Sequence, residues 1–206
     1  MTEELSAEER ILAAARKIFI KKGYDGARMQ EIADEAGINK AMLHYYFRNK
    51  DLLYERIFAE FTGKLFPNIN AVVNNDSLDI FEKIEKFVET YIFFLSQNPD
   101  IPVFIIGEMS KRPEVLQKVF SEKEAKNEAP MVAKFAMELM QESAKGKIKP
   151  MNPFHFMISV VAMCAFPFAA KPMMQAFMKM SEEDFNLFLQ ERKKEVVAML
   201  HSAMRP

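Results

Sequence analysis

Apolar residues along the chain recur at spacings of three and four, the period of an amphipathic helix. One such face, which follows the favoured N-cap residue Ser6, comprises Ile11, Leu12, Ala15, Ile18 and Phe19. Alternating runs of valine, isoleucine and threonine, which predict strands, are almost absent. The pattern therefore predicts an all-α fold of about nine helices.

Residues that start and stop helices divide the N-terminal part into three helices. Gly23 is expected to end the first one. Short helices are predicted over residues 29–36 and 40–47, with Gly37 as the break between them and Asn39 as the cap of the second. The sequence thus predicts two short helices joined by a tight turn.

The remaining sequence is also predicted to be helical, with boundaries at prolines and polar residues. Asn49 can cap a fourth helix, which Pro67 and residues 74–76 are expected to end. Asp76 or Ser77 is expected to begin a long helix that reaches Ser96. Further helices are predicted over residues 101–110 and 114–144, the latter with a bend or a restart at Pro130. A helix over residues 154–168 is predicted after Asn152-Pro153, and the last runs from the capping residue Ser181 to about Ala203.

Charge is distributed unevenly, although the formal net charge of the chain is only −1. Between Arg16 and Lys50 there are eight bases and four acids. Such an excess is compatible with an ordinary solvated helical surface. It is also the footprint expected of a module that binds phosphate.

The cellular setting is indicated by cysteine content and by the apolar stretches. Cys164 is the only cysteine, so no intrachain disulfide can form, and a reducing cytoplasm is expected. The polar and acidic residues 1–10 do not resemble a signal peptide. The most apolar stretch, residues 154–168, is shorter than the roughly 20 residues of a membrane span. We therefore expect a cytoplasmic protein without a membrane partner.

The segment from Gly23 to Leu53 carries the most specific signal. Its two short helices and the turn at Gly37-Ile38 form a helix-turn-helix, in which glycine provides the positive backbone angle that the turn needs. In this motif the second helix enters the major groove of DNA. The residues expected to pack the helices together are Ile32, Ala33, Ala36, Ile38, Leu43 and Phe47.

This segment resembles the N-terminal signature of the TetR family of bacterial transcription regulators. The chain length and the helical remainder also fit that family. The resemblance implies a DNA-binding domain over residues 1–50 and a helical domain over residues 51–206 that binds a small-molecule effector and forms a homodimer. It rests on the spacing of Gly23-Tyr24-Asp25, Ile32-Ala33, Ala36-Gly37-Ile38, Leu43, Tyr46-Phe47, Asn49-Lys50 and Leu52-Leu53.

The resemblance implies that the third helix is the recognition helix, which reads double-stranded operator DNA. Ala41, Met42 and His44 depart from the family's usual small residue, threonine and tyrosine. Met42 suits an apolar contact with a thymine methyl, and Lys40 suits guanine or a phosphate. Alternatively, Tyr46 belongs to the core and His44 only packs on the surface. The positions expected to contact DNA are Arg28, Lys40, Ala41, Met42, His44, Tyr45, Tyr46 and Lys50.

The helical domain is rich in phenylalanine and methionine, which form either ordinary core or an adaptable lining for an apolar ligand. The polar residues expected in this lining are Tyr91 and Glu108, because a polar group in an apolar pocket fixes the orientation of the ligand. Alternatively, Glu108 faces solvent at a helix end. No cofactor is expected besides an unidentified small hydrophobic or amphipathic effector. The resemblance implies an effector pocket, and the expected lining is Phe87, Tyr91, Phe94, Phe104, Glu108, Phe135, Met163 and Phe166.

The last two predicted helices have apolar faces that are broad for exposed helices. The resemblance implies that they pair across a two-fold axis as a four-helix bundle. A symmetric dimer would match a near-palindromic operator. The residues expected at this interface are Phe156, Val160, Phe188, Val196, Met199 and Leu200.

The resemblance implies a repressor that its ligand releases from DNA, because the ligand shifts the population between a DNA-binding and a released state. The sequence is also compatible with an activator that uses the same two states. An all-helical enzyme is disfavoured, because the sequence lacks His-Glu-x-x-His, Cys-x-x-Cys and a glycine-rich phosphate loop. No metal site or catalytic residue is therefore predicted. A helical carrier of hydrophobic ligands would explain the phenylalanine and methionine content, but not the spacing between Gly23 and Leu53.

Overall fold

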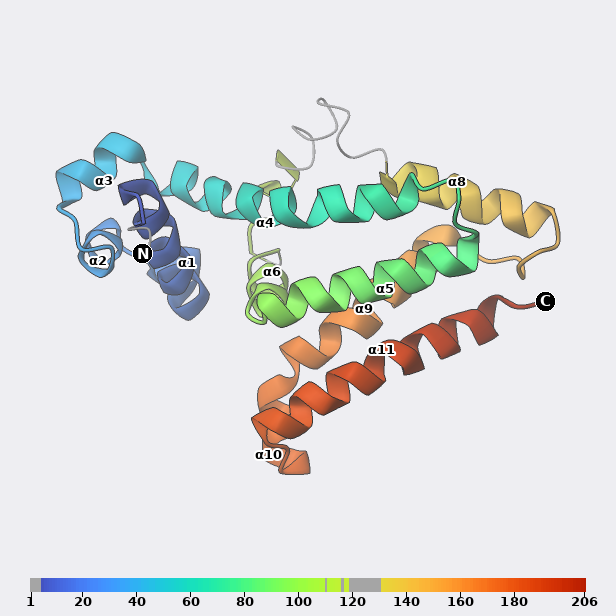
Figure 1. Ribbon diagram of the computed structural model, residues 1–206. Helices are drawn as coiled ribbons and strands as arrows, with labels where there is room; N and C mark the ends of the chain where they lie inside the picture. The colour runs from blue at the N-terminus through green and yellow to red at the C-terminus, as the bar shows by residue number, and fades with distance from the viewer. Residues whose placement is uncertain (1–4, 110, 116, 119–130) are drawn as a thin grey trace. The chain divides into compact units, whose positions relative to one another are not determined.

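The computed structural model describes residues 5–109, 111–115, 117–118 and 131–206, without the side chains of residues 108 and 109. The described residues form helices and no strand (Figure 1), which confirms the all-α prediction. The helices are α1 (Ala7–Gly26), α2 (Met29–Glu35), α3 (Lys40–Tyr46), α4 (Lys50–Val73), α5 (Ile80–Gln97), α6 (Ile101–Met109), α8 (Met131–Ala144), α9 (Pro153–Ala169), α10 (Lys171–Met178) and α11 (Glu182–Met204).

By compactness the chain divides into two units, which we call the N-terminal unit and the helical unit. As far as the residues are described, the N-terminal unit comprises Met1–Lys64 and Val103–Glu122, and the helical unit comprises Leu65–Pro102 and Lys123–Pro206. The N-terminal unit therefore extends past residue 50 and includes a second segment from much later in the sequence. The functional division into residues 1–50 and 51–206 stays a prediction.

Aromatic side chains form the centre of the N-terminal unit. Tyr54 of α4 lies edge-to-face against Phe19 of α1 and against Phe58, with ring centroids 4.9 and 5.2 Å apart. Phe104 of α6 stacks on Phe58 at 5.1 Å. Edge-to-face and offset contacts are the arrangements that aromatic quadrupoles favour. Because all four rings are buried, they join α6 to α1 and α4.

Several helices begin where the sequence predicts, because polar side chains satisfy their first N–H groups. Ser6 and Glu9 form a capping box at the start of α1, and Ser181 and Asp184 form another at the start of α11. Asn152 accepts hydrogen bonds from the first turn of α9, where proline follows at the first helical position. α1 extends to Gly26, but its helical backbone breaks at Gly23 as expected.

One predicted boundary was wrong, and for another only one of its two predicted markers was right. α5 begins after Asp79, which forms a capping box with Glu82, and not at Asp76 or Ser77. The Ser77 hydroxyl instead donates to Asn75 Oδ1 at 2.6 Å within a turn. Pro67 does not end α4, which continues to Val73 and ends directly before residues 74–76, the other end that the sequence predicts. The turns around this proline are held by apolar packing, in a cluster that comprises Phe66, Ile69, Val73 and Met131.

α9 also continues past a proline, because a side chain replaces the lost hydrogen bond. Pro167 has no N–H, so the carbonyl of Met163, four residues earlier, lacks its helical donor. The Arg192 guanidinium of α11 donates to this carbonyl from Nε at 3.3 Å and from Nη2 at 3.2 Å. Beyond α9 the chain bends by 60° into α10, a helix that the sequence patterns did not predict.

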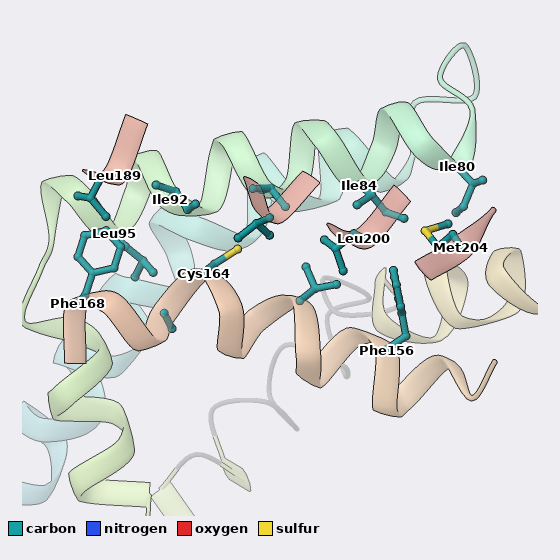
Figure 2. Packing of buried hydrophobic residues seen from close by; sticks show 14 of the residues in the cluster. Ile80, Ile84, Ile92, Leu95, Phe156, Cys164, Phe168, Leu189, Leu200 and Met204 are labelled. Atoms are coloured by element: carbon teal, nitrogen blue, oxygen red, sulfur yellow. The ribbon is translucent and has the colours of Figure 1, made fainter. Parts of the chain in front are cut away.

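One apolar core holds α5, α9 and α11 together in the helical unit. Figure 2 shows the labelled side chains of these three helices filling the space between them. Cys164 lies in this core, and burial raises the pKa of its thiol to about 12, although the charge of Arg192 acts in the opposite direction. Cys164 therefore behaves as a small buried hydrophobe.

A buried ion pair links α5 to α8. Lys83 is only 3% exposed, and its Nζ donates to both carboxylate oxygens of Glu138, at 2.7 and 2.9 Å. An ammonium without a partner in such a position would carry a large desolvation cost. The pair therefore fixes which faces of the two helices meet.

The residues predicted for a dimer interface lie mostly inside the helical unit, which calls for a correction. Phe156, Val160, Val196 and Leu200 are all buried in the core that α5, α9 and α11 share. Phe188 is half-buried and packs against the same core, and Met199 is exposed. The broad apolar faces of α9 and α11 reflect burial within one chain, because α5 covers them.

No single helix among the described residues combines the length and the hydropathy of a membrane span. α9 and α10 reach that threshold only when they are joined across their 60° bend.

Candidate nucleic-acid interface

The turn between α2 and α3 is built on Gly37. Gly37 adopts a φ of 67°, and its N–H donates to the Asp34 carbonyl at 3.2 Å while the Ile38 N–H donates to the Ala33 carbonyl at 3.0 Å. This pair of bonds is the Schellman arrangement, which satisfies the last carbonyls of α2. Asn39 Oδ1 then accepts from the Met42 N–H at 2.7 Å and caps α3. The positive backbone angle and the cap that the sequence predicts are both present.

α3 presents one buried face and one exposed face. Leu43 and Phe47 point into the N-terminal unit, together with Ile32 and Ala33 of α2. Tyr45 is 84% exposed. The other exposed side chains of α3 are Lys40, Ala41, His44 and Tyr46, and Met42 is half-buried. A helix held by one face and free along the other has the geometry of a recognition helix.

Positive charge on this unit is partly neutralised. Lys17 pairs with Glu35, and Lys22 pairs with Glu31. Among the described residues, the exposed cations Arg28, Lys40 and Arg48 make no ion pair. Arg48, between α3 and α4, was not among the predicted contacts, although its charge was visible in the sequence. These cations, like the exposed Lys21 of α1, remain available for phosphate.

His44 is oriented by a main-chain contact. Its Nδ1 lies 3.2 Å from the Arg48 carbonyl oxygen. Because a carbonyl only accepts hydrogen bonds, Nδ1 carries the proton, and in the neutral ring Nε2 is then an acceptor. His44 is exposed, so this acceptor is available to a partner outside the chain.

Lys50 has an intramolecular role that sequence reasoning missed. Its Nζ donates to the carbonyls of Tyr24 at 2.8 Å and Ala27 at 3.1 Å, and lies 4.1 Å from the centroid of the Tyr24 ring. Lys50 therefore anchors the corner between α1 and α2, residues 23–28. Its predicted contact with the DNA backbone stays a prediction.

Tyr24 is the centre of this corner. Its hydroxyl donates to Asp51 Oδ1 at 2.5 Å. Burial, the hydrogen bond to Asp51 and the charge of that carboxylate raise the pKa of Tyr24 to about 12, against the opposing charge of Arg112. The Arg112 guanidinium carbon lies 3.5 Å from the centroid of the ring. Arg112 comes from the second segment of the N-terminal unit, and sequence spacing carries no signal for this contact.

The residues predicted for an effector pocket are divided between the units. Phe104 is buried in the aromatic centre of the N-terminal unit, and the side chain of Glu108 lies outside the described residues. Phe166 of the helical unit is 60% exposed. The others are partly buried and pack against the core of the helical unit, and they are Phe87, Tyr91, Phe94, Phe135 and Met163.

Within that group, Phe87 and Tyr91 are in direct contact, with ring centroids 5.6 Å apart. Burial, with a smaller effect from Cys164, raises the pKa of Tyr91 to about 12. Among the described residues the Tyr91 hydroxyl has no hydrogen-bond partner. A surface concavity of about 400 Å³ elsewhere in the helical unit includes none of the predicted lining, and its walls are Lys149, Ala198, His201, Ser202, Arg205 and Pro206. No group of three His, Cys, Asp or Glu within the described ranges is placed to hold a metal ion.

Comparison with known proteins identifies relatives of the same architecture. A family model described as bacterial regulatory proteins, tetR family, matches residues 11–57. The negative transcriptional regulator of the biofilm operon icaADBC in Staphylococcus aureus, IcaR, is 30% identical over 128 residues, which make up 58% of this chain and 68% of IcaR. The transcriptional activator FasR of Mycolicibacterium smegmatis is 28% identical over 88 residues, which make up 43% of this chain but only 40% of FasR.

A solved structure supports the fold along nearly the whole chain. The crystal structure of AibR in complex with isovaleryl coenzyme A and operator DNA matches with a TM-score of 0.72 at 20% identity, over 94% of this chain and 97% of that chain. Two short helices joined at a glycine turn, with a free outer face on the second, define a helix-turn-helix protein of the DNA-binding class. The chain belongs to the TetR family of bacterial regulatory proteins.

Proposed function

We propose that this protein is a ligand-responsive transcription regulator that binds operator DNA through α3. The observation that carries the proposal is the free outer face of α3, which displays Lys40, His44 and Tyr45 while Leu43 is buried. A helix with charged, hydrogen-bonding and aromatic groups along one face suits the major groove, whose base edges present donors, acceptors and thymine methyls.

The contacts on DNA divide by chemistry. Lys40 and Arg28 supply cations for phosphate or guanine, and Arg48 joins them as a phosphate contact. Ala41 and Met42 supply apolar contacts for thymine methyls, and the hydroxyls of Tyr45 and Tyr46 donate to the DNA backbone. Two N–H groups of the Lys50 ammonium donate to carbonyls, and the third can donate to a DNA phosphate. The main contribution of Lys50 is to anchor the corner at Tyr24.

The effector is proposed to be a small, mostly apolar molecule with one polar group. The partly buried Phe87 and Tyr91, in contact with each other, supply an apolar surface with a single hydroxyl. The Tyr91 hydroxyl is placed to donate to an acceptor on such a ligand, which would fix the orientation of the ligand.

A homodimer is proposed to form through the outer face of α9 and not through the core residues of α9 and α11. Phe154, Ile158 and Val161 recur at spacings of four and three, so they share one face, and all three are exposed. Exposed apolar rows of this kind mark protein interfaces. A two-fold pair of N-terminal units would favour a near-palindromic operator.

The regulatory sense is proposed to be repression that the effector relieves. IcaR is a negative regulator and FasR is an activator, so both outcomes occur among relatives. A ligand shifts the equilibrium only through its different affinity for the DNA-binding and the released states. A carrier of hydrophobic ligands, the alternative function, would have no use for the free face of α3.

The test is selection of random double-stranded DNA on the purified protein, with sequencing of the bound pool at two salt concentrations. We expect a near-palindrome whose affinity falls steeply with salt, because several phosphate contacts release counterions. Weak binding without sequence preference at low salt, in protein from which bound ligands have been extracted, would instead support the carrier.

A further inference from the structure

The N-terminal unit contains a contact that comes from outside the helix-turn-helix sequence. Arg112 follows α6, yet its guanidinium carbon lies 3.5 Å from the centroid of the Tyr24 ring. Its Nη2 lies 3.5 Å from Asp25 Oδ1, and its Nη1 lies 3.9 Å from Asp51 Oδ1. One side chain thus contacts the corner between α1 and α2 and also the first turn of α4.

The corner needs such support, because little regular structure holds it. Gly23 breaks the helical backbone with a φ of 66°. The Ala27 N–H donates to the Tyr24 carbonyl at 3.3 Å, and that carbonyl also accepts from Lys50. α2 has no side-chain cap at its first residue. The orientation of the corner therefore depends on the Tyr24 ring and on the cations placed over it.

Arg28 is the last residue of this corner, directly before α2. It is exposed and makes no ion pair among the described residues. Its position is set by the residues before it, since it has no hydrogen-bonded cap of its own. The backbone from Asp25 to Arg28 directly follows Tyr24, so the contacts that hold Tyr24 also restrict this stretch of backbone. Arg112 is thus placed to control where Arg28 points without touching it.

We propose that Arg112 is a positioning residue for DNA binding, which holds the Tyr24 corner so that Arg28 meets a phosphate. The inference rests on the proposed DNA-binding function and adds a residue that the helix-turn-helix sequence does not contain. The segment around Arg112 is in this respect part of the DNA-binding unit, although it lies about sixty residues beyond the first turn of α4.

The experiment compares Arg112→Gln with Lys118→Gln in the full chain, using the operator recovered by selection. Lys118 lies on the same segment and pairs with Glu55, one turn beyond Asp51 on α4, so Lys118→Gln is the matched control for a lost ion pair. We expect Arg112→Gln to weaken operator binding roughly tenfold at unchanged base preference, the size of a desolvated cation–π contact. Lys118→Gln should bind as the unaltered protein does.

A double-mutant cycle with Arg28→Ala separates positioning from a general structural role. If Arg112 acts through Arg28, Arg112→Gln causes almost no further loss in the Arg28→Ala protein. The slope of affinity against salt should fall by about one for either single variant, and not further for the pair. Losses that multiply in the double variant would overturn the inference.

Two further measurements keep the outcome decisive. Asp25→Asn removes one partner of Arg112 at an exposed site, and it should show the same dependence on Arg28. Hydrogen exchange at residues 23–28 should be faster in Arg112→Gln and unchanged in Lys118→Gln. If the unaltered protein selects no DNA sequence, the proposed function fails; if exchange at the corner is the same in Arg112→Gln, the inference about Arg112 fails whatever the DNA result.

Discussion

His44 illustrates how one side chain can acquire a specific chemical role from a local contact. Sequence alone allowed it to be either a DNA contact or a surface residue. The contact of Nδ1 with the Arg48 carbonyl fixes the proton on Nδ1 and leaves Nε2 as an acceptor in the neutral ring. In the major groove, the donors that such an acceptor can meet are the amino groups of adenine and cytosine.

His44→Ala is expected to erase preference at one position of each half-site. Replacing the base there by an analogue without its amino group should cost the unaltered protein about 1–3 kcal/mol of binding free energy, and should cost His44→Ala almost nothing. Competition binding with modified operators measures both values. Equal sensitivity of the two proteins to the analogue would show that His44 does not read this base.

The helices of this protein owe their integrity to partners as much as to their own sequences. α9 contains Pro167 yet continues for two more residues, because Arg192 of α11 donates two hydrogen bonds to the Met163 carbonyl. The interaction also joins α9 to α11 at a fixed register. A buried carbonyl without a donor would otherwise carry a desolvation penalty.

Arg192→Met is expected to lower the free energy of unfolding by about 1–3 kcal/mol, since it leaves the Met163 carbonyl without a donor. Pro167→Ala should reduce this cost, because it returns an N–H to the helix at the required position. Urea denaturation of the two single variants and the double variant gives the coupling free energy between Arg192 and Pro167. Lys193→Met, at the next position, is the control, and a cost as large as that of Arg192→Met would argue against the explanation.

The assembly of two chains depends on which faces the folded chain leaves exposed. Ile158 is 71% exposed, whereas Val160, two residues later on the same helix, is 5% exposed. The two positions therefore test different things. Ile158 lies in the proposed dimer face, and Val160 lies in the core of the helical unit.

Ile158→Glu is expected to shift the protein from dimer to monomer with its helix content and melting temperature largely kept. Loss of the burial of one isoleucine in each copy is worth about 1.5–3 kcal/mol per side chain. Val160→Glu should instead unfold the helical unit, because a carboxylate would be buried without a partner. Analytical ultracentrifugation and circular dichroism read the two outcomes, and a dimer that tolerates Ile158→Glu would place the interface elsewhere.

Local chemistry in the sequence determined the helix-turn-helix. Gly37, Asn39 and the apolar spacing from Ile32 to Phe47 act within a few residues of one another, so the turn, the cap and the inward face were all predictable. The capping boxes at Ser6 and Ser181 were predictable for the same reason. The exposed face of α3 followed from the buried one.

Contacts between distant segments were decided only by the tertiary structure. Periodicity shows that Val160 and Val196 are on apolar faces, but not whether the chain's own α5 or a second copy covers them. In the same way, nothing near Tyr24 in the sequence indicates Arg112, and nothing near Pro167 indicates Arg192. These pairings arise because packing brings together helices whose order in the chain does not specify their neighbours, and each of them changed the assignment of a residue's role.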